Sequence, residues 1–129
     1  MPTKIRITKE DLLKSKILNP GWYLAKVQQT TAKAASTDQS TYWTIEMKVL
    51  GGPNQKDGSS PVGVTLYRVY SEKATGMAAP FFKAFGVQFT DDNDLDFDAA
   101  NGREIKVNVQ NALNNKGRMS NVVEDFQPA

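Results

Sequence analysis

Residues 42–49 alternate between apolar and polar side chains, and this period of two limits most strongly how the chain can fold. One side of the run carries Trp43, Ile45, Met47 and Val49, whereas the other carries Tyr42, Thr44, Glu46 and Lys48. Such alternation is typical of a strand with one face in the core and one in water. Related runs predict further strands over residues 21–28, 62–70, 103–110 and 118–126. In the run 62–70, Tyr67 and Val69 suggest a bulge or an end that is covered on both faces.

Helical signals occur at two places. Four apolar residues recur at helical spacing between the third and fourth predicted strands, with Pro80 suited to a first turn and Gly86 to the position after the last turn; they are Met77, Phe81, Phe82 and Phe85. Near the N-terminus, Thr8 and Asp11 form a capping-box pattern, which predicts a short helix near residues 9–16.

The order of these elements is three strands, a helix and two strands, after a leading arm. Five strands with a helix between the third and fourth are typical of the OB-fold, a small, partly open barrel. An immunoglobulin-type sandwich needs about seven strands. We therefore expect a mainly β protein, with residues 1–20 as an N-terminal arm containing the short helix and residues 21–129 as a five-stranded OB-fold barrel.

The composition excludes most catalytic chemistry. The chain contains neither cysteine nor histidine, which removes thiolate nucleophiles, zinc–thiolate sites and the usual general base near neutral pH. Phosphate-loop motifs and paired carboxylates are not found, and the aspartate-rich segment 91–98 has Phe97 where the helix–loop–helix calcium motif needs glycine. We expect a protein that is not an enzyme and that has no metal site and no cofactor.

The charges are unevenly distributed. The 129 residues include 16 Lys or Arg and 14 Asp or Glu, and five of those acids fall in segment 91–98. Subtracting five from 14 leaves nine acids against 16 bases, about +7 for the rest of the chain, which suits a polyanionic partner. Uninterrupted apolar stretches are too short for a membrane span, so we expect a cytoplasmic protein that does not contact membranes.

The chain resembles a family of short phage-encoded OB-fold proteins that bind single-stranded DNA. The resemblance covers most of residues 21–128 and rests on Gly21 and Tyr23, the segments 40–43 (STYW) and 102–107 (GREIKV), a Val-rich third strand, a Phe-rich helix and the ending 121–128. It implies sequence-tolerant DNA binding in phage replication and recombination, in the host cytoplasm. It also implies replication or recombination proteins as partners. Many single-strand binders recruit such enzymes through an acidic tail, whereas this sequence has only Glu124 and Asp125 near its end, so we expect such contacts to be made by other parts of the surface.

Single-strand binding needs cations along the phosphates and aromatic faces on which bases stack. In an OB-fold these lie on the outer face of strands two and three and on the loops between strands one and two and strands four and five. The predicted stacking residues are Tyr42, Tyr67 and Tyr70. The predicted phosphate contacts are Lys26, Lys33, Lys48, Arg68, Lys106, Lys116 and Arg118. Of the two tryptophans, Trp43 is expected in the core and Trp22 beneath the N-terminal arm.

A second reading of the same pattern is a small β-barrel phage structural or assembly protein that acts through protein–protein contacts. Such a protein would ignore oligonucleotides even at low salt. Self-association fits either reading, because a partly open barrel leaves strand edges with which a second copy can pair.

Overall fold

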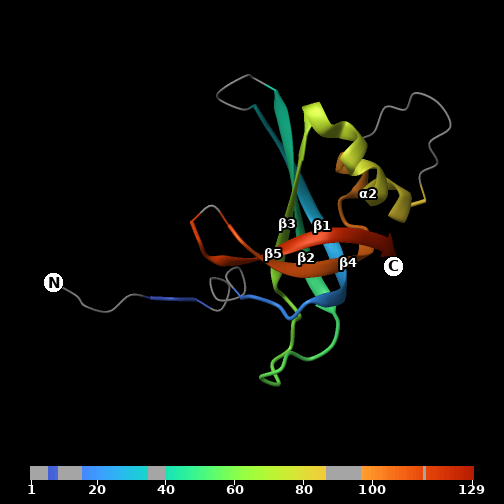
Figure 1. Cartoon of the computed structure of the whole chain (residues 1–129). Coiled ribbons are helices and arrows are strands. Elements are labelled where there is room, and N and C mark those ends of the chain that lie inside the picture. The colour runs from blue at the N-terminus through green and yellow to red at the C-terminus, as the bar shows by residue number, and fades with distance from the viewer. Residues whose placement is uncertain (1–5, 9–15, 35–39, 87–96, 115) are drawn as a thin grey trace.

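The structure is a computed structural model that describes residues 6–8, 16–34, 40–86, 97–114 and 116–129. It contains five strands, joined by antiparallel pairing into one sheet of order β3-β2-β1-β4-β5 (Figure 1). They are β1 (Gly21–Ala34), β2 (Thr41–Gly51), β3 (Thr65–Ser71), β4 (Glu104–Leu113) and β5 (Met119–Pro128). The mainly β class and the five strands are confirmed, but the sheet is not closed by a β3–β5 ladder.

The helical segments differ in part from the prediction. The predicted single helix begins earlier, as the 3₁₀ helix η1 (Glu72–Ala78), and continues as α2 (Ala79–Ala84) with Pro80 in its first turn. The hydroxyl of Ser71 caps η1 by accepting a hydrogen bond from the Lys73 amide at 3.2 Å. A further 3₁₀ helix that was not predicted, η2 (Phe97–Ala100), begins at the end of the aspartate-rich segment 91–98, of which residues 91–96 lie outside the described residues. Most of the predicted N-terminal helix lies outside the described residues.

The strand lengths also differ from the prediction. β1 continues to Ala34 through residues expected to form a loop, because Thr30 and Ala32 pair with Ile45 and Trp43 of β2. A register shift between Val27 and Gln29 lies midway along this pairing. In contrast, β3 begins only at Thr65. The predicted faces of β2 are confirmed, since Ile45, Met47 and Val49 are all fully buried.

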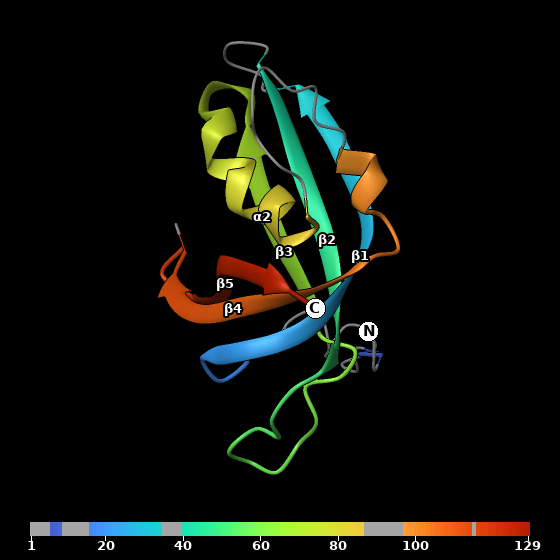
Figure 2. The ribbon, with the colours of Figure 1, turned by 90° about the vertical axis from the view of Figure 1, so that its right-hand side faces the viewer.

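Aromatic rings fill the core where α2 meets the sheet. Phe81 packs edge-on against Phe82, Phe85 and Phe126, with ring centroids 5.1–5.3 Å apart. Figure 2 shows α2 running alongside β3, with β5 below it. The α2 segment therefore covers the inner face of the sheet between its two edge strands.

At the opposite end, three amide side chains hold the chain that enters β1, and we call Gln55, Asn111 and Asn121 the amide clamp. The Leu18 amide donates to Asn121 Oδ1 at 2.9 Å, and Asn111 Nδ2 donates to the Leu18 carbonyl at 2.9 Å. Asn121 Nδ2 also donates to the Lys16 carbonyl at 2.8 Å, and the Asn19 amide donates to Gln55 Oε1 at 2.6 Å. The clamp buries Leu18 at 1% exposure.

Candidate nucleic-acid interface

The outer face of β1, β2 and β3 carries five of the ten predicted binding residues, four of them in cross-strand rows. Lys33 pairs with Tyr42, and further along the sheet Lys26 pairs with Lys48. Between these rows, Glu46 of β2 pairs with Tyr67 of β3. Directly opposed residues in antiparallel strands point to the same side, so these side chains share one surface.

Tyr67 is the most exposed aromatic side chain among the candidates, at 45% of its surface. Its hydroxyl donates to Glu46 Oε1 at 3.3 Å, which fixes the direction of the ring across the sheet. Partial burial, reinforced by the negative charge of Glu46, raises the pKa of Tyr67. The phenol is therefore neutral at physiological pH and offers an uncharged ring face.

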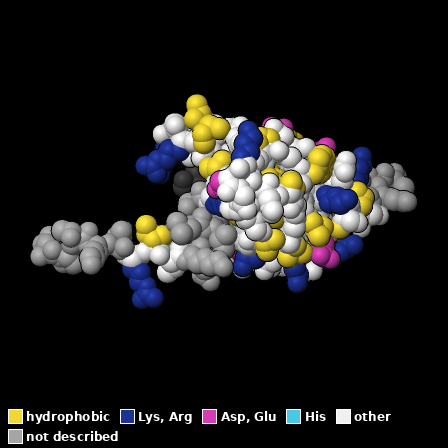
Figure 3. All heavy atoms as spheres, turned by 90° about the horizontal axis from the view of Figure 1, so that it is seen from below, with side chains coloured by type: hydrophobic (Ala, Val, Ile, Leu, Met, Phe, Trp, Pro, Cys, Tyr) yellow, Lys and Arg dark blue, Asp and Glu magenta, His cyan; other side chains and the backbone are white. Residues whose placement is uncertain are grey.

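A groove of about 320 Å³ separates β3 from the β4–β5 hairpin, and we call it the hairpin groove. Tyr67 lines it from β3 and Arg118 from the hairpin. Lys116 lies in the same turn, where its amide donates to Asn114 Oδ1 at 2.9 Å. The remaining lining residues are Lys16, Ile17, Thr65, Leu66, Asn114, Met119, Ser120 and Asn121. Figure 3 shows Lys and Arg side chains around the rim of the molecule seen from below.

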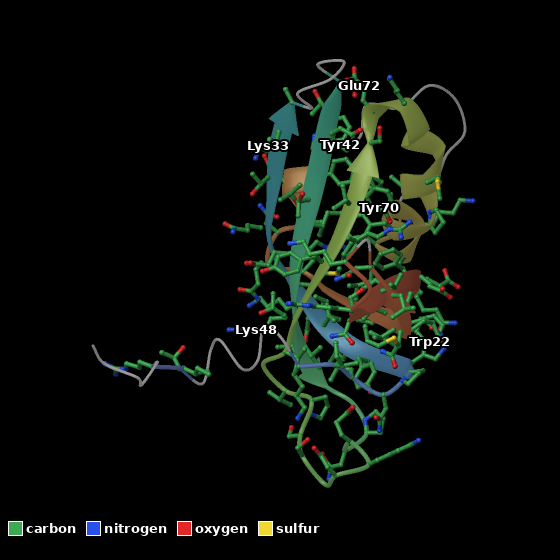
Figure 4. The ribbon with its side chains drawn as sticks, turned by 60° about the vertical axis from the view of Figure 1, so that its left-hand side comes forward. Trp22, Lys33, Tyr42, Lys48, Tyr70 and Glu72 are labelled. Atoms are coloured by element: carbon green, nitrogen blue, oxygen red, sulfur yellow. The ribbon has the colours of Figure 1, made fainter. Side chains whose placement is uncertain are left out.

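At the other end of the outer face, Lys33 and Tyr42 have an acidic neighbour. Figure 4 shows Lys33, Tyr42 and Glu72 together at the top of the sheet and Lys48 extending outward lower down. The Glu72 carboxylate accepts a hydrogen bond from the Thr41 amide at 2.8 Å. Because this carboxylate repels phosphate, the lower part of the sheet is the better candidate for anion binding.

Two predicted residues of β3, Tyr70 and Arg68, lie on the inner face instead. Tyr70 is only 3% exposed and stacks on Phe97 with centroids 5.9 Å apart, so the prediction that it stacks on bases is wrong for this structure. Its pairing with Trp43 of β2 explains its direction. β3 pairs with β2 without the predicted bulge, so alternate residues of β3 face inward.

Arg68 links the two edge strands of the open sheet. Its Nη1 donates to the Val123 carbonyl of β5 at 3.2 Å, and its guanidinium carbon lies 4.9 Å from the centroid of the Tyr70 ring. Arg68 pairs with Ile45, which faces the core. A structural role therefore replaces the predicted phosphate contact.

Lys106 lies in a separate concave region on the outer face of β1 and β4. Together with Trp22, Leu24 and Gln127 it lines a hollow of about 510 Å³, which we call the Trp22 pocket. Trp22 is 36% exposed. Most of the N-terminal arm that was predicted to cover it lies outside the described residues. Its described end, at Lys16 and Leu18, is bonded to Asn111 and Asn121 of β4 and β5. The alternation along residues 21–28 correctly predicts that Trp22 and the buried Tyr23 point to opposite faces of the sheet. Nothing in the sequence indicates the pocket.

Comparison of the sequence with protein-family models gives no match, and comparison with curated proteins gives none either. No helix in the described part of the chain is both long and apolar enough to cross a membrane. The described residues also contain no group of three or more acidic side chains placed to hold a metal ion. The function therefore has to be argued from the site itself.

Proposed function

We propose that the protein is a non-enzymatic, sequence-tolerant single-stranded DNA-binding protein. The observation that carries this proposal is the presence of an exposed ring and a cation in the lining of one groove: Tyr67 from β3 and Arg118 from the hairpin. A groove lined this way suits a strand whose bases stack on the ring while its phosphates contact the arginine. The role in phage replication and recombination rests on the sequence resemblance alone.

We further propose that the sheet is an OB-fold barrel opened between β3 and β5. The order β3-β2-β1-β4-β5 becomes that of a five-stranded barrel when its two edges meet. The Arg68–Val123 hydrogen bond already joins those edges, and α2 follows β3 in the chain, as the helix of this fold does. The hairpin groove then corresponds to the surface on which OB-folds bind oligonucleotides.

In this mechanism Tyr67, together with the half-buried Tyr42, supplies stacking, while Lys48, Lys116 and Arg118 neutralise phosphates. Each base stacked on an aromatic ring is worth about 1–3 kcal/mol. Phosphate contacts add affinity that falls as salt rises, because binding releases condensed counterions. Neither contribution depends on the identity of the base.

The test is the fluorescence anisotropy of labelled oligo-dT, titrated with the protein at low and moderate salt, with duplex DNA as competitor. We expect saturable binding that weakens with salt and resists duplex. Tyr67→Ala should weaken binding about tenfold. Val69→Ala is the matched control, because Val69 lies two residues along the same outer face and is 52% exposed.

Absence of binding at low salt would overturn the proposal and favour the small β-barrel assembly protein, with its outer face as a protein-binding surface. Equal affinities of Tyr67→Ala and the wild type would keep DNA binding but exclude stacking at this position.

A further inference from the structure

Part of the lining of the Trp22 pocket is held in place by the fold. Tyr23 and Gly52 belong to this lining. Tyr23 is 1% exposed, and its hydroxyl donates to the Asn19 carbonyl at 2.6 Å and accepts from Gln55 Nε2 at 3.0 Å. A Cβ atom on Gly52 would lie only 2.5 Å from Tyr23 Cδ1, so glycine is required beside this ring. Binding next to residues that are already ordered costs less conformational entropy.

The Trp22 pocket also has the two kinds of group that a nucleotide needs. The indole of Trp22 is partly exposed, and the exposed ammonium of Lys106 lies in the same lining. Gln127 adds a side-chain amide, which can bond to a base edge or to a phosphate. The combination of aromatic face and cation matches that of the hairpin groove.

A row of lysines connects the two sites across the outer face. Tyr67 pairs with Glu46, and two residues further along β2 lies Lys48, which pairs with Lys26 of β1. Leu24, two residues before Lys26, pairs with Lys106 of β4. At about 4.8 Å between neighbouring strands, the distance from β3 to β4 is about 14 Å across the sheet.

The Lys26–Lys48 pair places like charges directly opposite each other, which is unfavourable unless an anion lies between them. Glu104 of β4 pairs with Lys26 from the other side and offsets part of this charge. Lys48 and Lys106 have no carboxylate as direct cross-strand partner, since Lys48 pairs with Thr65 and Lys106 with Leu24 and Gln127. These two lysines are thus best placed to hold successive phosphates.

We propose that a bound single strand continues from the hairpin groove over Lys48 and Lys26 to the Trp22 pocket, where a base stacks on Trp22 and a phosphate contacts Lys106. This inference rests on the proposed function. In Figure 4 Lys48 and Trp22 point to opposite sides of the molecule, so the strand wraps around the curved sheet and the second contact is available only to longer oligonucleotides.

The experiment compares oligo-dT of about 4 and about 24 nucleotides, because about 4 nucleotides is the smallest length that an OB-fold covers and, at about 3.4 Å per stacked nucleotide, does not extend past about 14 Å. Trp22→Ala and Lys106→Gln should each weaken binding of the longer oligonucleotide, Trp22→Ala about tenfold. Both should leave binding of the shorter one within about twofold of the wild type. Lys83→Gln on α2 is the matched control for loss of a positive charge and should change neither affinity.

The outcomes separate this inference from the proposed function. If the wild type binds neither oligonucleotide, the proposed function fails. If it binds both and Trp22→Ala matches it on the longer one, only the extended path is overturned. If Trp22→Ala weakens the binding of both oligonucleotides equally, the path is also overturned, because Trp22 would then contact the part of the strand that short oligonucleotides already occupy.

A direct measurement uses the fluorescence of the indole. The chain has two tryptophans, so Trp43→Phe leaves Trp22 as the sole tryptophan. Phenylalanine retains a ring that can stack on Phe97, which now lies 5.3 Å from Trp43. Stacking of a base on Trp22 should quench this signal when the longer oligonucleotide binds. Unchanged Trp22 emission at saturation would contradict the path.

Discussion

The inner and outer faces of the same strands have separate tasks. Met47 is fully buried, whereas its neighbour Lys48 is exposed, although one peptide bond joins them. The inner face holds the fold through apolar and aromatic packing, while the outer face carries the side chains proposed to bind DNA. Because side chains alternate along a strand, stability and binding should be separable by substituting adjacent residues.

The largest expected effect comes from Met47→Ala on the inner face. Removing a fully buried side chain of this size leaves a cavity and should lower the free energy of unfolding by about 2–5 kcal/mol. Urea denaturation monitored by circular dichroism measures this change. Affinity for oligo-dT, corrected for the folded fraction, should stay at the wild-type value. A specific loss of affinity would show that the two faces are not independent.

The next effect tests a place where the inner face becomes polar. Along β4 and β5 the inward residues change from Val109 and Val123 to Asn111 and Asn121, where the amide clamp meets the entering chain. Asn121→Ala removes the bonds to the Leu18 amide and the Lys16 carbonyl and should cost about 1–3 kcal/mol. Asn121→Asp keeps only the acceptor and should fall between this variant and the wild type. Unchanged stability in both would mean that the clamp contributes nothing.

A smaller effect is expected for Lys48→Gln on the outer face. The free energy of unfolding should change by less than about 0.5 kcal/mol, as for most surface substitutions. The plot of log affinity against log salt should become shallower by about 0.7, the contribution of one phosphate contact on a single strand. Anisotropy titrations at several salt concentrations measure this slope. A slope equal to that of the wild type would exclude a phosphate contact at Lys48.

The smallest effect concerns Tyr70, which the fold places among the inner residues. Burial raises its pKa above the ordinary value of 10.0, although Arg68 acts in the opposite direction. Above about pH 10 the unfolded chain ionises this phenol before the folded protein does, so stability falls as pH rises. Tyr70→Phe should lose less stability than the wild type between about pH 8 and pH 11. Urea denaturation at several pH values measures these losses, and equal losses of stability in the variant and the wild type would contradict this expectation.

Much of the fold could be predicted because the spacing of apolar residues in some segments fits only one type of secondary structure. In β2, apolar and polar residues alternate from Tyr42 to Val49, and the phenylalanines of α2 recur at helical spacing. β3 is different, because aromatic or apolar residues occur at Leu66, Tyr67, Val69 and Tyr70 and so on both faces. Only pairing with β2 decides that Tyr67 faces outward and Tyr70 inward.

The candidate site was predictable only in part, for a related reason. The position of the chain just before β1 is set by Asn111 and Asn121, which bond to Leu18 from 93 and 103 residues away in the sequence. Similarly, the small polar residues after Gln29 resemble a loop, yet pairing with β2 makes them strand. Contacts between distant segments override local propensity at these positions.

The central position of β1 has a consequence for the order in which the chain folds. β1, β2 and β3 are consecutive and pair as neighbours, whereas the other edge of β1 pairs with β4, beginning with Gly21 against Val109. Ladders between distant segments close large loops and form slowly. During synthesis we expect β1, β2 and β3 to form a three-stranded meander first. The other edge of β1 then stays unpaired until residues 104–113 have been synthesised. A chaperone that shields strand edges would act on this intermediate.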